Sequence, residues 1–309
     1  MRSKRRKGRV IDGILLLDKS AGITSNGALQ SVKRLYGAAK AGHTGSLDPI
    51  ATGVLPICFG EATKFSQFLL DADKRYVATL QLGQKTTTGD SEGEVIETRE
   101  IPDLSDAEVE DCLQQFRGEI EQIPSMYSAI KVDGQPLYKL ARQGIEIERK
   151  ARTVLIRQLT LISRKKDQWI IDIHCTKGTY VRSLAEDIGE VLGCGAHVTA
   201  LRRHQAGPFV LNQALKLSEL ENLKLNSDLP GLDGVLQGVS SAVTDYPSVT
   251  MTELTAGYFL QGQPVQVSGT ERFGLVAVYR ETANETVFAG VGEVLDDGRI
   301  APRRLVAAQ

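Results

Sequence analysis

Apolar and polar residues follow two different periods along the chain, and the shorter period predicts strands. The run Gly13–Leu17 is continuously apolar, as in a strand that is buried on both faces. Tyr76–Leu82 and Trp169–Cys175 alternate apolar and polar residues, as half-buried strands do. We therefore expect these three segments to be strands of one sheet or of neighbouring sheets.

Other segments carry apolar residues at the spacing of a helix. One of them has Thr24 or Ser25 as its N-cap and Gly37 just past its end. Another begins with a capping box, in which Ser105 is followed three residues later by Glu108. The helical stripes are Ala28–Tyr36, Glu61–Leu70, Val109–Phe116 and Thr179–Leu192. Their amphipathic pattern predicts helices that cover a sheet.

Strands and helices mix without a regular alternation, which favours an α+β fold over a doubly wound one. From about Asp245 the pattern changes to one short helix ending at Gly262 and then to short β-like runs separated by glycine-containing turns. These runs are Val265–Val267, Leu275–Tyr279, Val287–Val291 and Arg299–Leu305. We expect a main domain over residues 1–244 and a small β-rich domain over residues 245–309.

The formal net charge is only −1, but the charges are segregated along the chain. Residues 1–40 hold ten Lys and Arg against two Asp and Glu, and residues 131–182 hold twelve against five. Residues 83–122 have three basic and twelve acidic residues, and residues 219–300 have four and twelve. Since attraction depends on local potential, the two basic segments predict a face that binds RNA. The basic N-terminus alone would as readily be a solvated tail.

Composition argues against several other classes of protein. With 309 residues and 41% apolar content, the chain can bury one large core and a smaller second one. No window approaches the roughly eighteen uncharged apolar residues that span a bilayer, and no apolar stretch follows the basic start, so we expect a cytoplasmic protein. The four cysteines form no CxxC pair and do not favour a zinc site.

A Gly-rich loop, Ala41–Gly53, contains the most distinctive chemistry. Its Asp48 precedes Pro49, which biases Asp48 toward an extended backbone, and its glycines permit the close approach of a large ligand. In an arbitrary loop, such an Asp-Pro pair more often only starts a turn. Here His43 in the same loop can stack on a base, and basic residues precede it. Together these features favour an RNA site without establishing an enzyme.

The sequence GHTGSLDPIATGVLP in this loop resembles the catalytic motif of the TruB family of pseudouridine synthases. The resemblance covers essentially the whole chain, with one departure at Ser20, where the family usually has proline. The other matching segments, in order, are GILLLDKSAGITS, DKRYVATLQLG, IPSMYSAIKVDGQPLYKLARQG, CTKGTYVRSLAEDIG and GCGAHVTALRR. The resemblance implies a pseudouridine synthase catalytic domain, with a mixed or antiparallel sheet flanked by helices, and a C-terminal RNA-binding domain of the PUA type.

The resemblance also implies an activity, the isomerisation of uridine to pseudouridine at position 55, in the T-loop of tRNA. Asp48 matches the nucleophile of the family, and Arg182 matches the residue that pairs with it, in a geometry that allows a bidentate fork. Tyr76 would stack on the uracil and accept or relay a proton, although a strand tyrosine is more often a core residue. Whether Asp48 attacks uracil C6 or ribose C1′, or first assists elimination, stays open.

Further residues match positions that bind the substrate. Tyr180 and Leu201 match the walls of the uracil pocket, and His43 matches the residue that stacks when the uridine is extruded from the RNA. Lys19 and Lys131 match basic positions near the cleft, where each would contact a phosphate or support the motif loop. Without the family, Tyr180 and Leu201 would be ordinary packing residues and His43 a solvated loop residue.

The implied reaction needs neither a redox partner nor a group donor, so we expect no cofactor and no metal. The expected partner is tRNA, bound at the T-arm and, through the C-terminal domain, toward the acceptor end. We expect a monomer with no obligate protein partner and no membrane association. Two other functions stay open, a non-catalytic protein that folds RNA and a guide-RNA-dependent enzyme in a larger particle. The presence of Asp48, Tyr76 and Arg182 favours catalysis over the first of these.

Overall fold

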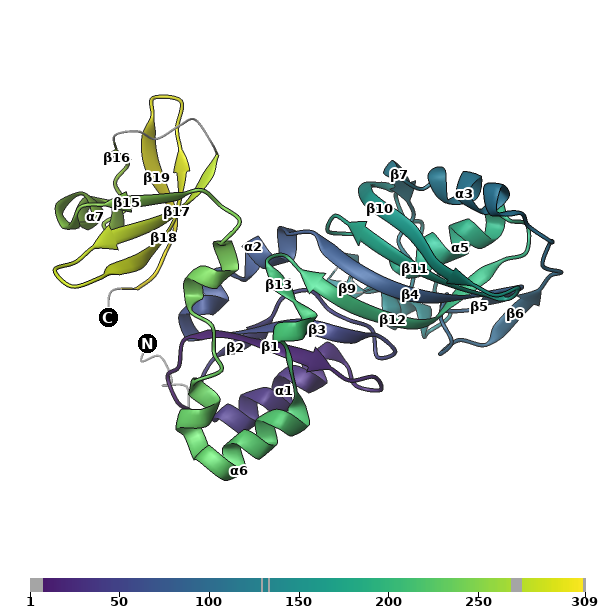
Figure 1. The fold of residues 1–309 in the computed structure, drawn as a ribbon, viewed down its shortest axis with the longest axis horizontal. Helices are drawn as coiled ribbons and strands as arrows, with labels where there is room; N and C mark the ends of the chain where they lie inside the picture. The colour runs from purple at the N-terminus through teal and green to yellow at the C-terminus, as the bar shows by residue number, and fades with distance from the viewer. Residues whose placement is uncertain (1–7, 129, 133, 268–273, 308–309) are drawn as a thin grey trace.

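One large mixed sheet runs through the molecule, and a smaller sheet lies beside it (Figure 1). The computed structural model describes residues 8–128, 130–132, 134–267 and 274–307. Parallel pairing of β1 with β14 and of β3 with β12, among otherwise antiparallel pairs, makes the large sheet mixed and confirms the predicted α+β fold. The strand order is β14 (Leu215–Lys216), β1 (Gly13–Lys19), β3 (Thr52–Phe59), β12 (Ala196–Ala206), β4 (Lys74–Leu82), β11 (Gln168–Cys175), β10 (Arg152–Arg164) and β7 (Gly118–Gln122).

The N-terminal strand and helix form where the sequence predicts them. All seven residues of β1 are buried, and a short turn leads from it into α1 (Ser25–Tyr36). Thr24 is the N-cap, because its side chain accepts a hydrogen bond from Gly27 N, and Gly37 ends the helix in the left-handed conformation. The helix therefore ends at Tyr36, shortly before the loop that contains Asp48.

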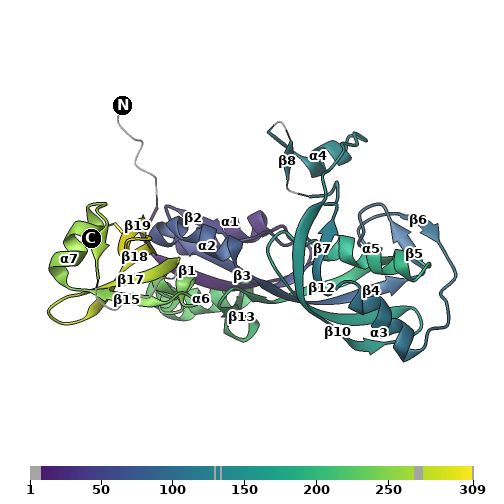
Figure 2. The same ribbon diagram turned by 90° about the horizontal axis from the view of Figure 1, so that it is seen from above.

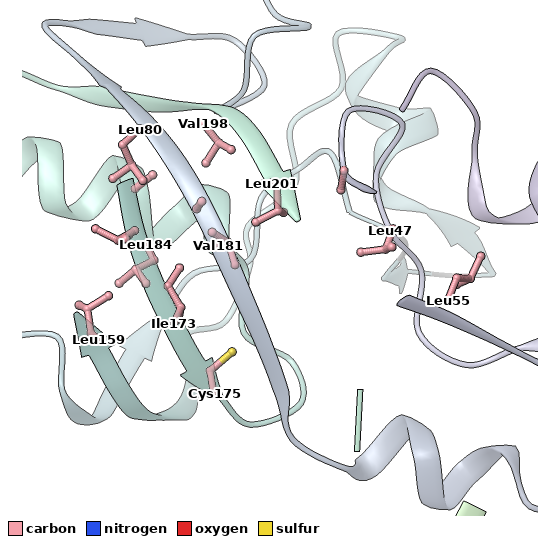
Figure 3. Close-up of a cluster of buried hydrophobic side chains, with 14 of the residues drawn as sticks. Leu47, Leu55, Leu80, Leu159, Ile173, Cys175, Val181, Leu184, Val198 and Leu201 are labelled. Atoms are coloured by element: carbon pink, nitrogen blue, oxygen red, sulfur yellow. The ribbon is translucent and has the colours of Figure 1, made fainter. Parts of the chain in front are cut away.

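The main core lies where α5 (Val181–Val191) packs on the middle strands of the sheet (Figure 3). Val181 and Leu184 of the helix belong to one buried cluster with Leu80, Ile173 and Val198 of the strands. Burying an aliphatic side chain of this size contributes roughly 1.5–3 kcal/mol. The apolar stripe predicted for this helix therefore fixes its first turn over the sheet.

Two segments differ from their predictions. The loop expected over Ala41–Gly53 is shorter, because β2 (Ala41–His43) pairs with β3, and Thr52 already begins β3. Its glycines do not prevent this pairing of backbone groups. The helix expected over Glu61–Leu70 is interrupted at Phe65, between the 3₁₀ helix η1 (Gly60–Lys64) and α2 (Ser66–Asp71). The Phe65 side chain is fully buried, so packing overrides the local helical pattern here.

Two long elements have no counterpart in the sequence predictions. Strand β10 spans thirteen residues and pairs with both β11 and β7, although most of its charged side chains are exposed. Helix α6 (Leu217–Asp233) contains Pro230, a residue that discourages the prediction of a helix. Tertiary contacts hold its end, since Leu232 is buried and its carbonyl accepts a hydrogen bond of 2.8 Å from the Tyr36 hydroxyl.

The C-terminal residues form a five-stranded sheet with its own core, as the change of pattern near Asp245 predicts. Phe259, Val278 and Ile300 are fully buried in it. A second shared cluster joins this sheet to the main body, where the Phe65 and Phe288 rings lie 5.4 Å apart. The strands, in order across the sheet, are β15 (Ser248–Met251), β17 (Leu275–Glu281), β18 (Thr286–Val294), β19 (Arg299–Leu305) and β16 (Val265–Gln266), with α7 (Glu253–Leu260) packed against them.

Shorter elements complete the chain. The hairpin of β8 (Lys131–Val132) and β9 (Gln135–Pro136), with α4 (Leu137–Ala141), stands away from the sheet in Figure 2. No helix within the described ranges is long and apolar enough to cross a membrane. The remaining short elements of the chain are β5 (Gln84–Thr86), β6 (Val95–Thr98), α3 (Asp106–Gln114), β13 (Phe209–Val210), η2 (Leu211–Gln213) and η3 (Val239–Val243). The capping box of Ser105 and Glu108 is present at α3, as predicted.

Gly53 lets β3 approach β12, and its replacement should be costly. Its φ is +102°, and a Cβ at this position would lie 2.2 Å from the Arg203 carbonyl oxygen. We expect Gly53→Ala to lower the free energy of unfolding by about 2–5 kcal/mol, because strain and overlap add. Gly22→Ala is the matched control, since Gly22 has φ +81° and nothing within 4 Å. Urea titration would measure both variants, and equal losses would contradict the close-approach argument.

Candidate active site

A cavity of about 320 Å³ opens where the loop of residues 44–51 meets β4, β12 and the first turn of α5. Five residues singled out from the sequence line it together, although they are far apart along the chain. They are Asp48, Tyr76, Tyr180, Arg182 and Leu201. The fold therefore brings the predicted nucleophile, its partner and the predicted pocket walls to one place.

The loop that carries Asp48 is fixed on both sides of this residue. Before it, the buried Ser25 side chain donates to the Leu47 carbonyl at 3.0 Å and accepts from the Leu47 amide at 2.7 Å. After it, the Pro49 carbonyl accepts a hydrogen bond of 2.9 Å from Gly22 N. Ala51 N donates to the Asp48 carbonyl at 3.0 Å and closes a turn. The Asp48 carboxylate is thus held on a tightly bonded turn.

Lys19 supports this turn through hydrogen bonds to backbone carbonyls. Its ammonium donates to three carbonyls, those of Ser20 at 2.9 Å, Ile23 at 2.7 Å and Pro49 at 3.4 Å. The residue is buried, and burial lowers the pKa of Lys19 to about 8, although the nearby Asp48 carboxylate opposes this shift. Of the two roles expected for Lys19, these contacts match support of the motif loop, because its donors point to backbone oxygens.

Arg182 lies at the inner wall of the cavity, between two carboxylates. Its Nη2 is 3.0 Å from Asp48 Oδ2, and its Nη1 is 3.5 Å from Asp90 Oδ2. The same two nitrogens donate to the carbonyls of Tyr127 and Thr88, each at 2.9 Å. The guanidinium is therefore shared between Asp48 and Asp90, whereas a bidentate fork would direct both nitrogens to Asp48. This sharing aims the Asp48 carboxylate into the cavity.

Asp90 is a site residue that the sequence analysis missed. It lies in the acidic stretch of residues 83–122, but the residue is only 2% exposed and its carboxylate accepts two further hydrogen bonds. Oδ1 accepts from the Thr88 hydroxyl at 2.6 Å and from Glu92 N at 3.1 Å. No local motif marks it, because its contact with Arg182 joins positions 92 residues apart.

Tyr76 and Tyr180 line the cavity from two different elements, the strand β4 and the start of the helix α5. Tyr76 lies on β4, and burial raises the pKa of its hydroxyl, while the charge of Arg203 acts in the other direction. Tyr180 is the N-cap of α5, where its backbone exchanges two hydrogen bonds with the Gln122 amide, at 3.0 and 3.3 Å. Leu201 adds an apolar wall from β12, near Leu47 in Figure 3. The cavity thus has flat and apolar walls around one carboxylate.

Three family models match the chain one after another. They describe the TruB family pseudouridylate synthase N-terminal domain at residues 33–181, the tRNA pseudouridylate synthase B C-terminal domain at 182–244, and the pseudouridine synthase II TruB C-terminal domain at 247–306. The tRNA pseudouridine synthase B of Ectopseudomonas mendocina is 55% identical over 306 residues, which cover 99% of each chain. The chain belongs to the TruB family of pseudouridylate synthases.

Other similar proteins agree with this assignment. The tRNA pseudouridine synthase B of a Shewanella species is 51% identical over 310 residues, covering 98% of this chain and 97% of its own. Among solved structures, a Cbf5–Nop10–Gar1 complex contains a chain with a TM-score of 0.73 and 25% identity, covering 95% of this chain and 84% of that one. An H/ACA ribonucleoprotein bound to a substrate RNA contains a chain that shares the fold, with a TM-score of 0.73 and 22% identity over 99% and 92%. These findings confirm the family resemblance, the fold class and the enzyme class.

Besides Lys19, two residues that match TruB binding positions lie outside the cavity lining. His43 ends β2, where it pairs with Ile57 of β3, and burial together with the charge of Arg203 lowers its pKa. Its Nδ1 is buried and has no hydrogen-bond partner among the described residues. Lys131 is exposed on the β8–β9 hairpin (Figure 2). A contact of either residue with the substrate stays a prediction.

The two basic segments contribute differently to the described surface. Residues 1–7, which contain half of the basic residues of the N-terminal segment, lie outside the described residues. In the second segment, most of the basic side chains are exposed: Lys131, Lys139, Arg142, Lys150, Arg152, Arg157, Arg164, Lys165, Lys166 and Lys177. Within the described part of the chain, no group of three or more His, Cys, Asp or Glu residues is arranged to hold a metal ion.

The reaction rate of a TruB enzyme that uses the Asp48 carboxylate should fall in acid. Burial, as the largest cause, raises the pKa of Asp48 above its ordinary value of 3.8, and the charge of Arg182 opposes this shift. Because only the ionised form is a nucleophile, we expect the single-turnover rate to drop about tenfold per pH unit below an inflection above 3.8. Rates measured with prebound tRNA would test this, and a flat profile down to pH 3.8 would contradict it.

Proposed function

We propose that the chain isomerises uridine to pseudouridine at position 55, in the T-loop of tRNA, with Asp48 as the nucleophile. The pairing of the Asp48 carboxylate with Arg182 at 3.0 Å, on the wall of a cavity also lined by Tyr76, is the observation that carries this proposal. Two relatives with 51% and 55% identity are named tRNA pseudouridine synthase B, which supports tRNA as the substrate.

The site contains what this isomerisation needs. The bond from uracil N1 to ribose C1′ breaks, the base turns, a C5–C1′ bond forms, the proton on C5 leaves, and N1 gains a proton, so the isomerisation needs no net proton. The Asp48 carboxylate acts without a separate activating base. It attacks ribose C1′ and expels N1, or adds to uracil C6 and opens the C5–C6 double bond, or first assists elimination, and any bond to Asp48 breaks again before the product leaves. Tyr76 lies beside it to stack on the base and to accept or relay the C5 proton. The apolar walls that Leu201 and Tyr180 contribute to the cavity keep the detached base in place.

The target must leave the RNA loop before it can reach Asp48. A stacked uridine is inaccessible, so the enzyme extrudes the base at a cost of a few kcal/mol, and His43 is the candidate to fill the gap. The exposed basic side chains of residues 131–182 support contact with the phosphates of the T-arm. We further propose that residues 1–244 carry catalysis and that residues 245–309 form a PUA-like domain directed toward the acceptor end.

We assign the protein to the cytoplasm and propose that it acts as a monomer without a cofactor. A guide-RNA-dependent role has one observation in its favour, the fold shared with the H/ACA ribonucleoprotein chain. Against it stand the curated relatives, which match 97–99% of their own length and carry the tRNA enzyme name. A tRNA-folding activity is compatible with catalysis, because base extrusion also loosens tertiary contacts of the RNA.

One experiment separates these functions. The purified protein is incubated with an unmodified tRNA transcript in the presence of a chelator, and pseudouridine is mapped by carbodiimide-dependent stops of primer extension. We expect one stop at T-loop position 55 and none in a transcript with cytidine at that position. A stop that needs an added guide RNA would transfer the function to the particle-dependent class. No stop under either condition would leave RNA folding as the function.

A further inference from the structure

Arg203 is a buried cation for which the proposed reaction has no role so far. It is 1% exposed, lies on β12, and lines the same cavity as Asp48 and Tyr76. Burial of a guanidinium is costly unless its donors are satisfied and its charge is used. Since the residue sits at the wall of a reaction cavity, its contacts indicate what it does there.

The side chain of Arg203 joins the two ends of the loop that carries Asp48. Its Nε donates to the Val54 carbonyl at 2.7 Å, and its Nη2 donates to the Gly45 carbonyl at 3.2 Å. Gly45 stands near the start of the loop, and Val54 follows its end. The backbone of Arg203 also pairs with Gly53 of β3. One residue therefore fixes both the entry and the exit of the segment that presents the carboxylate.

Arg203 also faces Tyr76. The two residues are direct partners across the antiparallel strands β12 and β4, so their side chains leave the sheet on the same face. The charge of Arg203 lowers the pKa of the buried Tyr76 hydroxyl, against the larger effect of desolvation. The guanidinium thus lies between the loop of the nucleophile and the residue proposed to move the proton.

Arg203 faces the cavity because it lies two residues after Leu201 on β12, and side chains two apart along a strand share a face. Register shifts against β4 occur between Val198 and Ala200 and again between Arg203 and Gln205. Shifts of this kind re-aim side chains and are common next to active sites. Between them, Leu201 and Arg203 both line the cavity, whereas Arg202 pairs with Asp18 at 2.8 Å. Arg202 therefore offers a matched control on the neighbouring position.

Lys74, the nearest other buried cation in the cavity lining, cannot take over these contacts. Its ammonium already donates to the carbonyls of Leu69 at 3.2 Å, Leu70 at 2.6 Å and Ala72 at 2.6 Å. These three bonds use all the donors of a lysine. The planar guanidinium of Arg203, with donors in several directions, is suited to join separate elements.

We propose that Arg203 is a positioning residue of the isomerisation, which holds the Asp48 loop and the Tyr76 hydroxyl in one fixed arrangement. The proposal rests on the function proposed above and adds a residue that acts through two others. Preorganised groups lower the barrier because they need not be ordered during the reaction. Loss of Arg203 should therefore slow the chemical step more than it weakens the binding of tRNA.

The first test compares Arg203→Met with Arg203→Lys in single-turnover assays. We expect Arg203→Met to lower the single-turnover rate about 100-fold, because misplaced reacting groups slow a reaction on this scale. The Kd for tRNA should stay within about threefold of the wild-type value. Arg203→Lys keeps the charge but not the fork, and should recover part of the rate. A folded Arg203→Met variant that reacts at the wild-type rate would overturn the inference. A rise in the Kd for tRNA as large as the loss of rate would also overturn it, because weaker binding would then explain the slower reaction.

The second test does not depend on activity. The protein is labelled with 3-fluorotyrosine, and the fluorine resonance of Tyr76 is assigned by its absence from Tyr76→Phe. We expect Arg203→Lys, and Arg203→Met if it folds, to shift this resonance, and Arg202→Met to leave it in place. An unshifted Tyr76 signal in both Arg203 variants would overturn the contact. An inactive wild-type protein would sink the proposed function, whereas the fluorine shifts would still test the arrangement.

Discussion

Asp48→Asn is expected to abolish pseudouridine formation. The substitution keeps the shape of the side chain but removes the negative charge that would attack carbon. We expect the single-turnover rate to fall by at least about four orders of magnitude, the scale on which loss of a nucleophile acts in other enzymes. Carbodiimide-dependent primer extension after long incubation would measure it. A rate within tenfold of wild type would remove Asp48 from the chemistry.

The same variant should still fold and bind tRNA. Folding raises the pKa of Asp48, so the folded state binds a proton there more tightly than the unfolded state does. Stability from this group is therefore present at low pH and is lost as pH rises through the raised pKa. At neutral pH a neutral Asn avoids this cost, so we expect a melting temperature no lower than that of the wild type. A clear drop would mean that the pairing with Arg182 outweighs burial.

Arg182→Met is expected to damage both stability and catalysis. The Arg182 side chain is 6% exposed and the Asp90 side chain 3% exposed, so the substitution leaves a buried carboxylate and two carbonyls without their partner. Breaking a buried pair in this way costs about 3–5 kcal/mol. We also expect the isomerisation rate to fall at least about 100-fold, because the Asp48 carboxylate loses the group that aims it.

Thermal unfolding and single-turnover rates would measure these effects, with Arg117→Met as the control. Arg117 pairs with the exposed Glu110, neither residue lines the cavity, and an ion pair to an exposed carboxylate contributes little. Double substitution of Arg182 and Asp90 gives a second check. If the buried charge of Asp90 causes the instability, the double variant with Asp90→Asn should melt at a clearly higher temperature than Arg182→Met alone. An Arg182→Met variant as stable as the control would contradict the buried network.

The local sequence pattern was sufficient to predict the elements that are stabilised by their own caps or by an apolar stripe. The capping box at Ser105, the cap at Thr24 and the apolar stripe of α5 are all formed as predicted. Elements that depend on distant partners were missed. Strand β10 is long, charged and exposed on one side, and it becomes a strand because β11 and β7 pair with its backbone.

The same division applies to the candidate site. The motif segments marked Asp48, Tyr76, Tyr180, Arg182 and Leu201, and all five line one cavity. The contacts that Asp90, Ser25 and Arg203 make at the site could not be recognised, because each joins residues far apart in the sequence. Lys19 was recognised, but only its three hydrogen bonds to backbone carbonyls distinguish loop support from phosphate contact.

The sequence by itself determined the family and the fold class, and it marked five residues that line one cavity, because these depend on residue types in a fixed order. Only the tertiary structure decided how the charges are paired. Arg182 is shared between Asp48 and Asp90, and Arg203 lies between the Asp48 loop and Tyr76. Charge pairing depends on distance in space and on burial, and both arise only when the strands and loops have packed.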